Sequence, residues 1–262
     1  MKFSRKTLGI PYAVFLVLFV AAPLLVLFYY AFTNGQGQFT VQNLTDFFTD
    51  PNTLGTLVYS LLIAAATTAL CLLLAYPAAY ILATSRLKAK SVIIMIFVMP
   101  MWINFSLRIT ALKEILTVIE GNLAFYPFLN SVIGMPYDFL PFMILPIYNT
   151  IVRLDGSLIE AAKDLGANDR QAFFRVTLPL SVPGIVSGVS MVFLPAMTNY
   201  VVLDMLYNNT YIMGSLIGSY FSAYNWHGGS MIALVLLGII CLFTLLTGGM
   251  ETEDARTGGA LL

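Results

Sequence analysis

The chain has 262 residues, of which 59% are hydrophobic and only 10% are charged, with 13 Lys and Arg against 13 Asp and Glu. A globular protein in water is typically about 25% charged, so this composition excludes a soluble domain and indicates a membrane protein. The zero net charge argues against nucleic acid as a partner. The two cysteines lie in apolar runs, which argues against a disulfide framework or a metal site.

Six stretches are apolar over enough residues to cross a bilayer, which takes about 20 residues in a helix. The strands of a membrane barrel would be shorter and would alternate between apolar and polar residues, and these stretches do not alternate. The sequence therefore predicts an all-α, polytopic membrane protein with six transmembrane helices. They cover residues 10–32, 54–83, 91–109, 128–151, 183–202 and 231–249.

The first stretch is longer than the apolar part of a signal peptide, so we expect it to remain as a span. With six spans, every Lys and Arg except Arg108 and Lys113 falls on one side of the membrane. Cytoplasmic connections hold the excess of positive charge, so both termini are expected in the cytoplasm. The connections 33–53 and 203–230 contain no Lys or Arg and are expected outside.

The third and fourth stretches carry less regular signals. Arg108 has the wrong sign for a cation site and is expected to pair with an acid such as Glu114 or with a partner subunit. Proline kinks or breaks helices, so the four prolines between Pro127 and Pro146 predict irregular backbone near the outer end of the fourth span. No Asp or Glu is assigned to the centre of a span, which argues against a secondary transporter.

The connection between the fourth and fifth spans is polar but patterned like two short helices. Ser157 and Glu160 have the spacing of a capping box, and Gly166 stands where a helix C-terminus needs left-handed dihedrals. Asn168 and Gln171 repeat the start signal. The product is a helical hairpin that either lies in the membrane interface or docks a cytoplasmic partner.

Small residues open the fifth span. Gly184 and Gly188 form a G-x-x-x-G pattern, which allows close approach of another helix. We expect this face to support assembly with a second membrane subunit, with a contact inside the chain as the alternative.

The hairpin contains a recognisable motif. Glu160-Ala161-Ala162, then Gly166, Val176 and Leu178-Pro179, resemble the EAA motif of the membrane subunits of binding-protein-dependent ABC importers, with Val176 in place of the usual Ile. The resemblance implies a type I ABC importer permease fold, a single transmembrane domain over 1–262 with its core at about 54–250, and a coupling-helix loop at 155–178. It also implies that these residues and Ser157 contact an ATPase dimer.

A nucleotide site is expected on another chain. Nothing in the sequence has the G-x-x-x-x-G-K-[ST] spacing that cradles phosphates, so ATP and magnesium are expected on the ATPase, with no cofactor in this chain. No catalytic arrangement of Ser, His, Cys and Asp is apparent, and the single histidine, His227, is expected in an outside loop. The chain is therefore expected to be a non-catalytic subunit.

Two further segments narrow the resemblance. They are Pro100-Met101-Trp102-Ile103-Asn104 with Arg108, and Phe193 to Met197 followed by Tyr200 and Asp204. Both look like the first permease subunit of spermidine/putrescine importers in the bacterial cytoplasmic membrane. The resemblance implies a second permease subunit and an extracytoplasmic polyamine-binding protein as partners. The connection after the third span is shorter, and the C-terminal tail less basic, than in that family.

A polyamine pathway should offer carboxylates and aromatic faces to a polycation. Asp204, with Tyr200 and Tyr207 on either side, is the leading candidate, and the alternative for Asp204 is a solvated loop residue. The other candidates are Trp102, Asn104 and Tyr148, whose alternative is an interfacial or packing role.

Other functions stay open. An importer for another small solute, such as iron, sulfate or molybdate, shares the scaffold. From a different class, the alternatives are a secondary transporter and a non-transporting membrane anchor or receptor, both of which the EAA residues disfavour.

Overall fold

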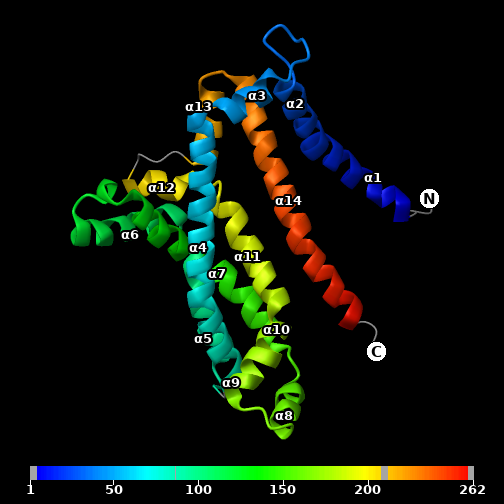
Figure 1. Ribbon diagram of the computed structural model, residues 1–262, viewed down its shortest axis with the longest axis vertical. Helices are drawn as coiled ribbons and strands as arrows, with labels where there is room; N and C mark the ends of the chain where they lie inside the picture. Colours follow the sequence, from blue (N-terminus) through cyan, green and yellow to red (C-terminus); the bar gives the residue numbers. More distant parts are fainter. Residues whose placement is uncertain (1–4, 86, 208–211, 259–262) are drawn as a thin grey trace. The chain divides into compact units, whose positions relative to one another are not determined.

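The computed structural model describes residues 5–85, 87–207 and 212–258 (Figure 1). Within these ranges the regular elements are helices, and the one extended pairing is a bridge between Thr33 and Phe39. The all-α prediction is therefore confirmed. The α-helices are α1 Arg5–Leu16, α2 Ala22–Ala31, α3 Gln42–Thr49, α4 Pro51–Thr84, α5 Lys90–Val98, α6 Phe105–Glu120, α7 Pro127–Val152, α8 Gly156–Asp164, α9 Asp169–Ala172, α10 Leu178–Leu180, α11 Val182–Ala196, α12 Tyr200–Tyr207, α13 Met213–Ser222 and α14 Trp226–Gly258.

Four helical stretches are long and apolar enough to cross a membrane, and two bent helix pairs pass the same test together. Counting each bent pair as one span gives up to six, in agreement with the sequence. The four are Ile10–Ala31, Pro51–Thr84, Pro127–Val152 and Trp226–Gly248. The bent pairs are Lys90–Trp102 with Phe105–Glu120, and Asp169–Leu180 with Val182–Ala196.

The irregular backbone lies in the third span and not in the fourth, so that prediction is wrong. The chain bends by 95° between the 3-10 turn Met99–Trp102 and α6. Ile103 is extended, and Asn104 restarts the helix by accepting hydrogen bonds from the backbone of the following turn. α7, by contrast, is continuous through three internal prolines, which a membrane helix tolerates where a neighbouring helix covers it.

The predicted fifth span is also interrupted. α11 ends at Ala196, and α12 begins at Tyr200 after a turn in which the amides of Thr198 and Asn199 both bond to the carbonyl of Pro195. The stretch 183–202 is therefore one helix and the start of a second.

The chain divides into two compact units, residues 1–58 with 213–241, and residues 59–212 with 242–262. The helices α4 and α14 each begin in the first unit and end in the second. In the first unit, the span Ile10–Ala31 contains a π-helical turn at Val17–Ala21 and exposes its apolar side chains almost throughout. Most of its surface is therefore left to lipid or to another subunit.

His227 lies in the first turn of α14 and not in a loop, which corrects the sequence prediction. Its Nδ1 atom is 3.0 Å from the carbonyl oxygen of Tyr30. The next residue, Gly228, is helical as well and closely packed. A Cβ atom there would lie 2.7 Å from the ring of Tyr220, so glycine serves close packing at this point.

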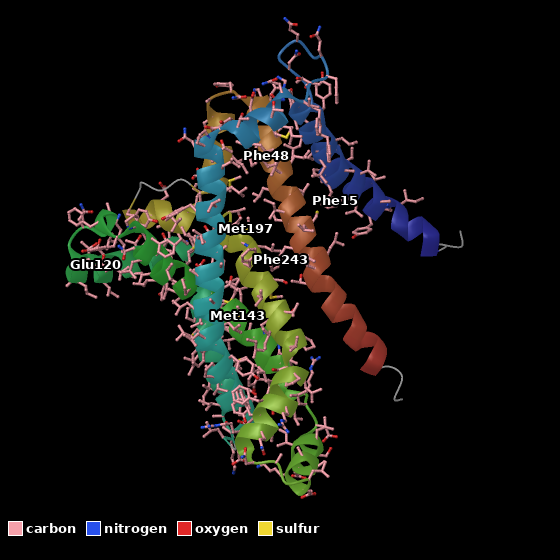
Figure 2. All side chains as sticks on the ribbon, in the orientation of Figure 1. Phe15, Phe48, Glu120, Met143, Met197 and Phe243 are labelled. Carbon is pink, nitrogen blue, oxygen red and sulfur yellow. The ribbon has the colours of Figure 1, made fainter. Side chains whose placement is uncertain are left out.

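In the second unit α11 lies along α7 (Figure 1). A Cβ atom on Gly184 would lie 2.5 Å from Oγ1 of Thr150 and 2.9 Å from the carbonyl oxygen of Pro146. A Cβ atom on Gly188 would lie 2.7 Å from Sδ of Met143, which Figure 2 labels on α7. The G-x-x-x-G face is thus filled by this chain itself, and its assignment to a second subunit is wrong.

Candidate functional site

The 155–178 loop begins with α8, whose cap differs from the predicted one. Asp155 is the N-cap, and its carboxylate accepts a hydrogen bond of 2.9 Å from the amide of Ser157. That bond lowers the pKa of the Asp155 carboxyl below its usual value. The predicted capping box of Ser157 and Glu160 is wrong because the helix already begins at Gly156, which leaves the Glu160 side chain exposed.

α8 ends as the sequence predicts. Gly166 has a φ of +89°, a conformation that costs little only for glycine. Its amide donates to the carbonyl oxygen of Lys163 at 2.8 Å. The amide of Ala167 donates to the carbonyl oxygen of Ala162 at 3.0 Å. This is a Schellman closure. A Cβ atom on Gly166 would meet nothing within 4 Å, so the requirement is on the backbone angle and not on space.

The second helix of the loop, α9, carries the predicted capping box. Oδ1 of Asn168 accepts from the amide of Gln171 at 2.8 Å, and Oε1 of Gln171 accepts from the amide of Asn168 at 3.0 Å. Lys163 and Asp169 form an ion pair of 2.7 Å across the turn, which raises the pKa of Lys163 and lowers that of Asp169. Both side chains are exposed, so the pair adds little stability.

Phe173 anchors the loop to the membrane helices. Its ring makes edge contacts with Tyr80 and Tyr76 of α4, at centroid distances of 5.0 and 5.9 Å. The hydroxyl groups of Tyr76 and Ser181 are 2.9 Å apart. α4 therefore holds the end of the loop that leads into α11.

The side of the loop that faces away from the rest of the chain is apolar and exposed. Leu165 is 90% exposed and Phe174 is 58% exposed, and Ala161 is exposed beside Glu160. Both helices border a groove of about 400 Å³, lined by Ala162, Leu165, Gly166, Ala167, Gln171, Arg175 and Val176. Leu178 is partly buried and Pro179 exposed. Exposed apolar side chains around a groove are typical of a surface that docks another protein.

Four of the predicted pathway residues, Trp102, Asn104, Tyr200 and Asp204, lie just before α6 or on α12, and α12 packs on both α6 and α7. Tyr200 and Asp204 lie one turn apart on the exposed face of α12. Trp102 is 75% exposed at the bend before α6. Asn104 caps α6 through hydrogen bonds of 3.0 and 3.4 Å from the amides of Ser106 and Leu107, so this side chain has a structural role.

Two aromatic residues lie elsewhere. Tyr207 is buried with its hydroxyl against that of Ser131 on α7, so it does not present a face beside Asp204, contrary to the prediction. Tyr148 is partly buried on α7, some 17 residues beyond Ser131 and therefore about 25 Å away along the helix. The structure does not bring Tyr148 to Asp204.

The sequence analysis missed one buried ion pair. Nη2 of Arg108 is 2.5 Å from Oδ1 of Asp138, and both residues are more than nine-tenths buried. The predicted pairing of Arg108 with Glu114 or a partner subunit is therefore wrong. Asp138 also lies near the middle of α7, which contradicts the expectation that span centres lack Asp and Glu. The charge pattern along one helix could not reveal a partner 30 residues away.

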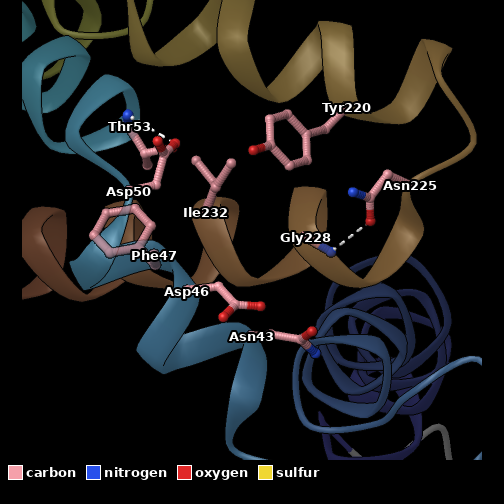
Figure 3. Close-up of a pocket in the computed structure, with 9 residues that line it drawn as sticks. All are labelled: Asn43, Asp46, Phe47, Asp50, Thr53, Tyr220, Asn225, Gly228 and Ile232. Atoms are coloured by element: carbon pink, nitrogen blue, oxygen red, sulfur yellow. Dashed lines mark hydrogen bonds between the residues drawn. The ribbon is translucent and has the colours of Figure 1, made fainter.

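A second missed feature is a polar cavity of about 200 Å³ in the first unit (Figure 3). Two carboxylates, Asp46 and Asp50, line it together with the rings of Phe47 and Tyr220. Asp50 accepts hydrogen bonds from the hydroxyl and amide of Thr53, and the hydroxyl contact is the main reason why its pKa is lowered. The other lining residues are Asn43, Thr53, Asn225, Gly228 and Ile232.

Curated proteins similar to this chain are membrane permeases. The spermidine/putrescine transport system permease protein PotB of Haemophilus influenzae is 35% identical over 263 aligned positions, which cover 92% of this chain and 91% of that protein. The protein of the same name from Escherichia coli is 33% identical, and the alignment covers 88% of this chain and 91% of that protein.

Solved structures share the fold at low sequence identity. A bacterial alginate ABC transporter, in complex with an alginate-bound periplasmic protein, has a chain that matches with a TM-score of 0.74 at 12% identity, covering 95% of this chain and 94% of that one. A chain of the MetNI methionine ABC transporter matches with a TM-score of 0.59 at 16% identity, covering 78% and 99%. The type I ABC importer permease fold is thus confirmed.

The family model described as "Binding-protein-dependent transport system inner membrane component" matches residues 3–250, which is most of the chain. The match contains both the bent third span and the 155–178 loop. This chain therefore belongs to the family of inner-membrane components of binding-protein-dependent transport systems.

Proposed function

We propose that this chain is a permease subunit of an ATP-driven importer and forms half of the translocation pathway for polyamines such as spermidine and putrescine. The observation that carries the proposal is the similarity to two proteins named as spermidine/putrescine permeases, over about nine-tenths of their length. The uncovered apolar face of the 155–178 loop supports the mechanical part of the role.

The loop is the contact with an ATPase dimer. Ser157, Glu160 and Ala161 are exposed on α8, and the two caps and the left-handed Gly166 fix the loop as a rigid projection. Phe173 connects that projection to α4. A movement of the ATPase would therefore be passed to the membrane helices. ATP and magnesium are bound by the ATPase chain, and this subunit moves without catalysing a reaction.

The cationic substrate is favoured by the charges on the outer side. The exposed side chains of Asp204 and Tyr200 offer a carboxylate and an aromatic face, the two groups that attract an alkylammonium ion. Trp102 adds a second exposed ring. The cavity with Asp46 and Asp50 lies on connections without Lys or Arg, and their negative potential favours the approach of a polycation.

The subunit works in the inner membrane with both termini in the cytoplasm, beside a second permease subunit and below an extracytoplasmic polyamine-binding protein. The first span supports assembly, because its apolar side chains are exposed within the described part of the chain. The positive-inside rule supports the orientation.

Uptake of radiolabelled spermidine tests the proposal. Cells that lack polyamine uptake would express this chain with its ATPase, second permease and binding protein. We expect saturable uptake that stops on ATP depletion and is inhibited by unlabelled putrescine, and an ATPase that co-purifies with the subunit in mild detergent. Inhibition by sulfate, molybdate or iron in place of putrescine would assign another solute. Purification without an ATPase would contradict the importer assignment itself.

A further inference from the structure

Four polar contacts join α7 to both ends of α6, to the turn after α6 and to the last turn of α12. Asn130, Ser131 and Asp138 form one side of α7, which we call the α7 polar stripe, and their exposed fractions are 0%, 0% and 6%. Buried polar side chains are costly inside a membrane protein unless they are paired. Each member of the stripe is paired with a residue of α6, α12 or the turn between α6 and α7.

The partners connect three segments to one helix. Nδ2 of Asn130 donates to Oε2 of Glu120 and to the carbonyl of Leu123, both at 2.9 Å; Figure 2 labels Glu120 at the far end of α6. The hydroxyl of Ser131 contacts that of Tyr207, and Asp138 accepts from Arg108. The α7 polar stripe therefore fixes both ends of α6 and the last turn of α12.

α12 approaches α7 closely at Gly134, between the polar contacts. A Cβ atom on Gly134 would lie 2.5 Å from Cδ1 of Leu206 and 3.4 Å from Cγ1 of Val202. The buried face of α12 thus packs against α7, which leaves Tyr200 and Asp204 on its exposed face. The direction in which these two side chains point depends on how α12 is seated.

The geometry of the ion pair between Arg108 and Asp138 favours a role in positioning α6 on α7 over a role in stabilising the α6 helix. Arg108 lies in the first turns of α6, where a cation is opposed by the helix dipole. Only Nη2 contacts Asp138, and the buried Nε and Nη1 atoms have no hydrogen-bond partner among the described residues. A pair optimised only for stability would use the bidentate geometry that guanidinium allows.

We propose that Arg108 and Asp138 are positioning residues for transport. Their ion pair holds α6 against α7, and because α12 packs on α6, it also fixes the position of α12. The position of α12 in turn places Tyr200 and Asp204 at the substrate route. The proposal rests on the proposed function for the role of Asp204. The seating of α12 itself does not depend on which solute is carried.

Two measurements test the pair. The first is the KM and Vmax of spermidine uptake at equal amounts of subunit in the membrane. The second is the rate at which a membrane-impermeant maleimide labels Tyr200→Cys in a cysteine-free background. The variants are Asp138→Asn, Arg108→Lys and the exchanged pair Arg108→Asp with Asp138→Arg. Glu114→Ala is the matched control, since Glu114 is an exposed charge on the same helix.

We expect Asp138→Asn to raise KM at least tenfold and to change the labelling rate at least threefold, with Vmax altered less than twofold. Arg108→Lys and Glu114→Ala should stay within threefold of wild type, and the exchanged pair should recover most of the loss. A purely structural role would lower the amount of subunit and Vmax without a selective rise in KM.

The proposal is overturned if Asp138→Asn leaves KM and labelling unchanged, or if the exchanged pair is no better than Asp138→Asn. If Asp138→Asn accumulates poorly, the exchanged pair decides: KM and labelling close to wild type support the proposal, and a tenfold rise in KM at normal amounts of subunit overturns it. A wild-type chain without spermidine uptake would instead refute the proposed function, while the labelling contrast would still decide whether the ion pair seats α12.

Discussion

Replacing the glycines of α11 by alanine should weaken the packing of α11 on α7 in a graded way. At Gly184 the new methyl group would meet Thr150 at 2.5 and 2.8 Å and the backbone carbonyl of Pro146 at 2.9 Å. The carbonyl cannot turn aside as a side chain can, so the helices must separate. Overpacking of this kind costs about 1–3 kcal/mol, and the better helix propensity of alanine returns about 0.5–1 kcal/mol.

Gly184→Ala should therefore lower the free energy of unfolding by up to about 2.5 kcal/mol. Gly188→Ala should cost less, because its nearest contact, at 2.7 Å, is the flexible thioether of Met143. Gly238→Ala is the matched control, since nothing lies within 4 Å of a Cβ atom at that position of α14. It should be neutral or slightly stabilising.

The assay is unfolding of the purified subunit in mild detergent, by heat or by titration with a denaturing detergent. The expected order of stability is Gly238→Ala, then Gly188→Ala, then Gly184→Ala. Equal midpoints for the three variants would refute the close packing of α11 on α7. If the variants lose stability only in the assembled importer and not in the isolated subunit, the G-x-x-x-G face contacts a partner subunit.

Three other predictions concern topology, coupling and substrate. Single cysteines at Gly37 and Asn168 should label from opposite sides of the membrane, and labelling from one side would refute the orientation. Glu160→Lys and Gly166→Pro should dissociate or uncouple the ATPase without loss of membrane insertion, because Glu160→Lys alters an exposed contact and Gly166→Pro forbids the positive φ of the turn. Normal transport and normal co-purification of the ATPase in these variants would show that the loop is only an interfacial hairpin. Asp204→Asn should reduce the efficiency of polyamine uptake about ten- to a hundredfold, equivalent to about 1–3 kcal/mol, with Asp204→Glu less affected; unchanged uptake by the Asn variant would make Asp204 a solvated surface residue.

Local signals in the sequence predicted much of the 155–178 loop. The capping box of Asn168 and Gln171 and the left-handed Gly166 are confirmed, because each depends on residues only a few positions apart. The start of α8 was misplaced because Asp155 and Ser157 are both good caps, and a propensity argument does not choose between neighbours.

The region of α6, α7 and α12 was predicted less well because its contacts are not local. Arg108 and Asp138 meet only because the chain bends by 95° before α6. The hydrophobic periodicity of the sequence reveals neither the bend nor the ion pair. Tyr207 looked like a partner of Asp204 by spacing, but its position on α12 directs it to Ser131. Tyr200, Asp204 and Trp102 were thus proposed from their chemical type, while their positions relative to one another required the fold.

The contacts of the 155–178 loop also imply an order of folding. Its caps and turn join neighbours, whereas the contact between Tyr76 and Ser181 joins residues 105 positions apart. Chains fold from the N-terminus during synthesis, so α4 is complete when Phe173 emerges, and α14 has not yet been made. The loop can therefore settle on α4 early, and a ribosome-bound chain presents the exposed apolar side of the loop before the last span enters the membrane.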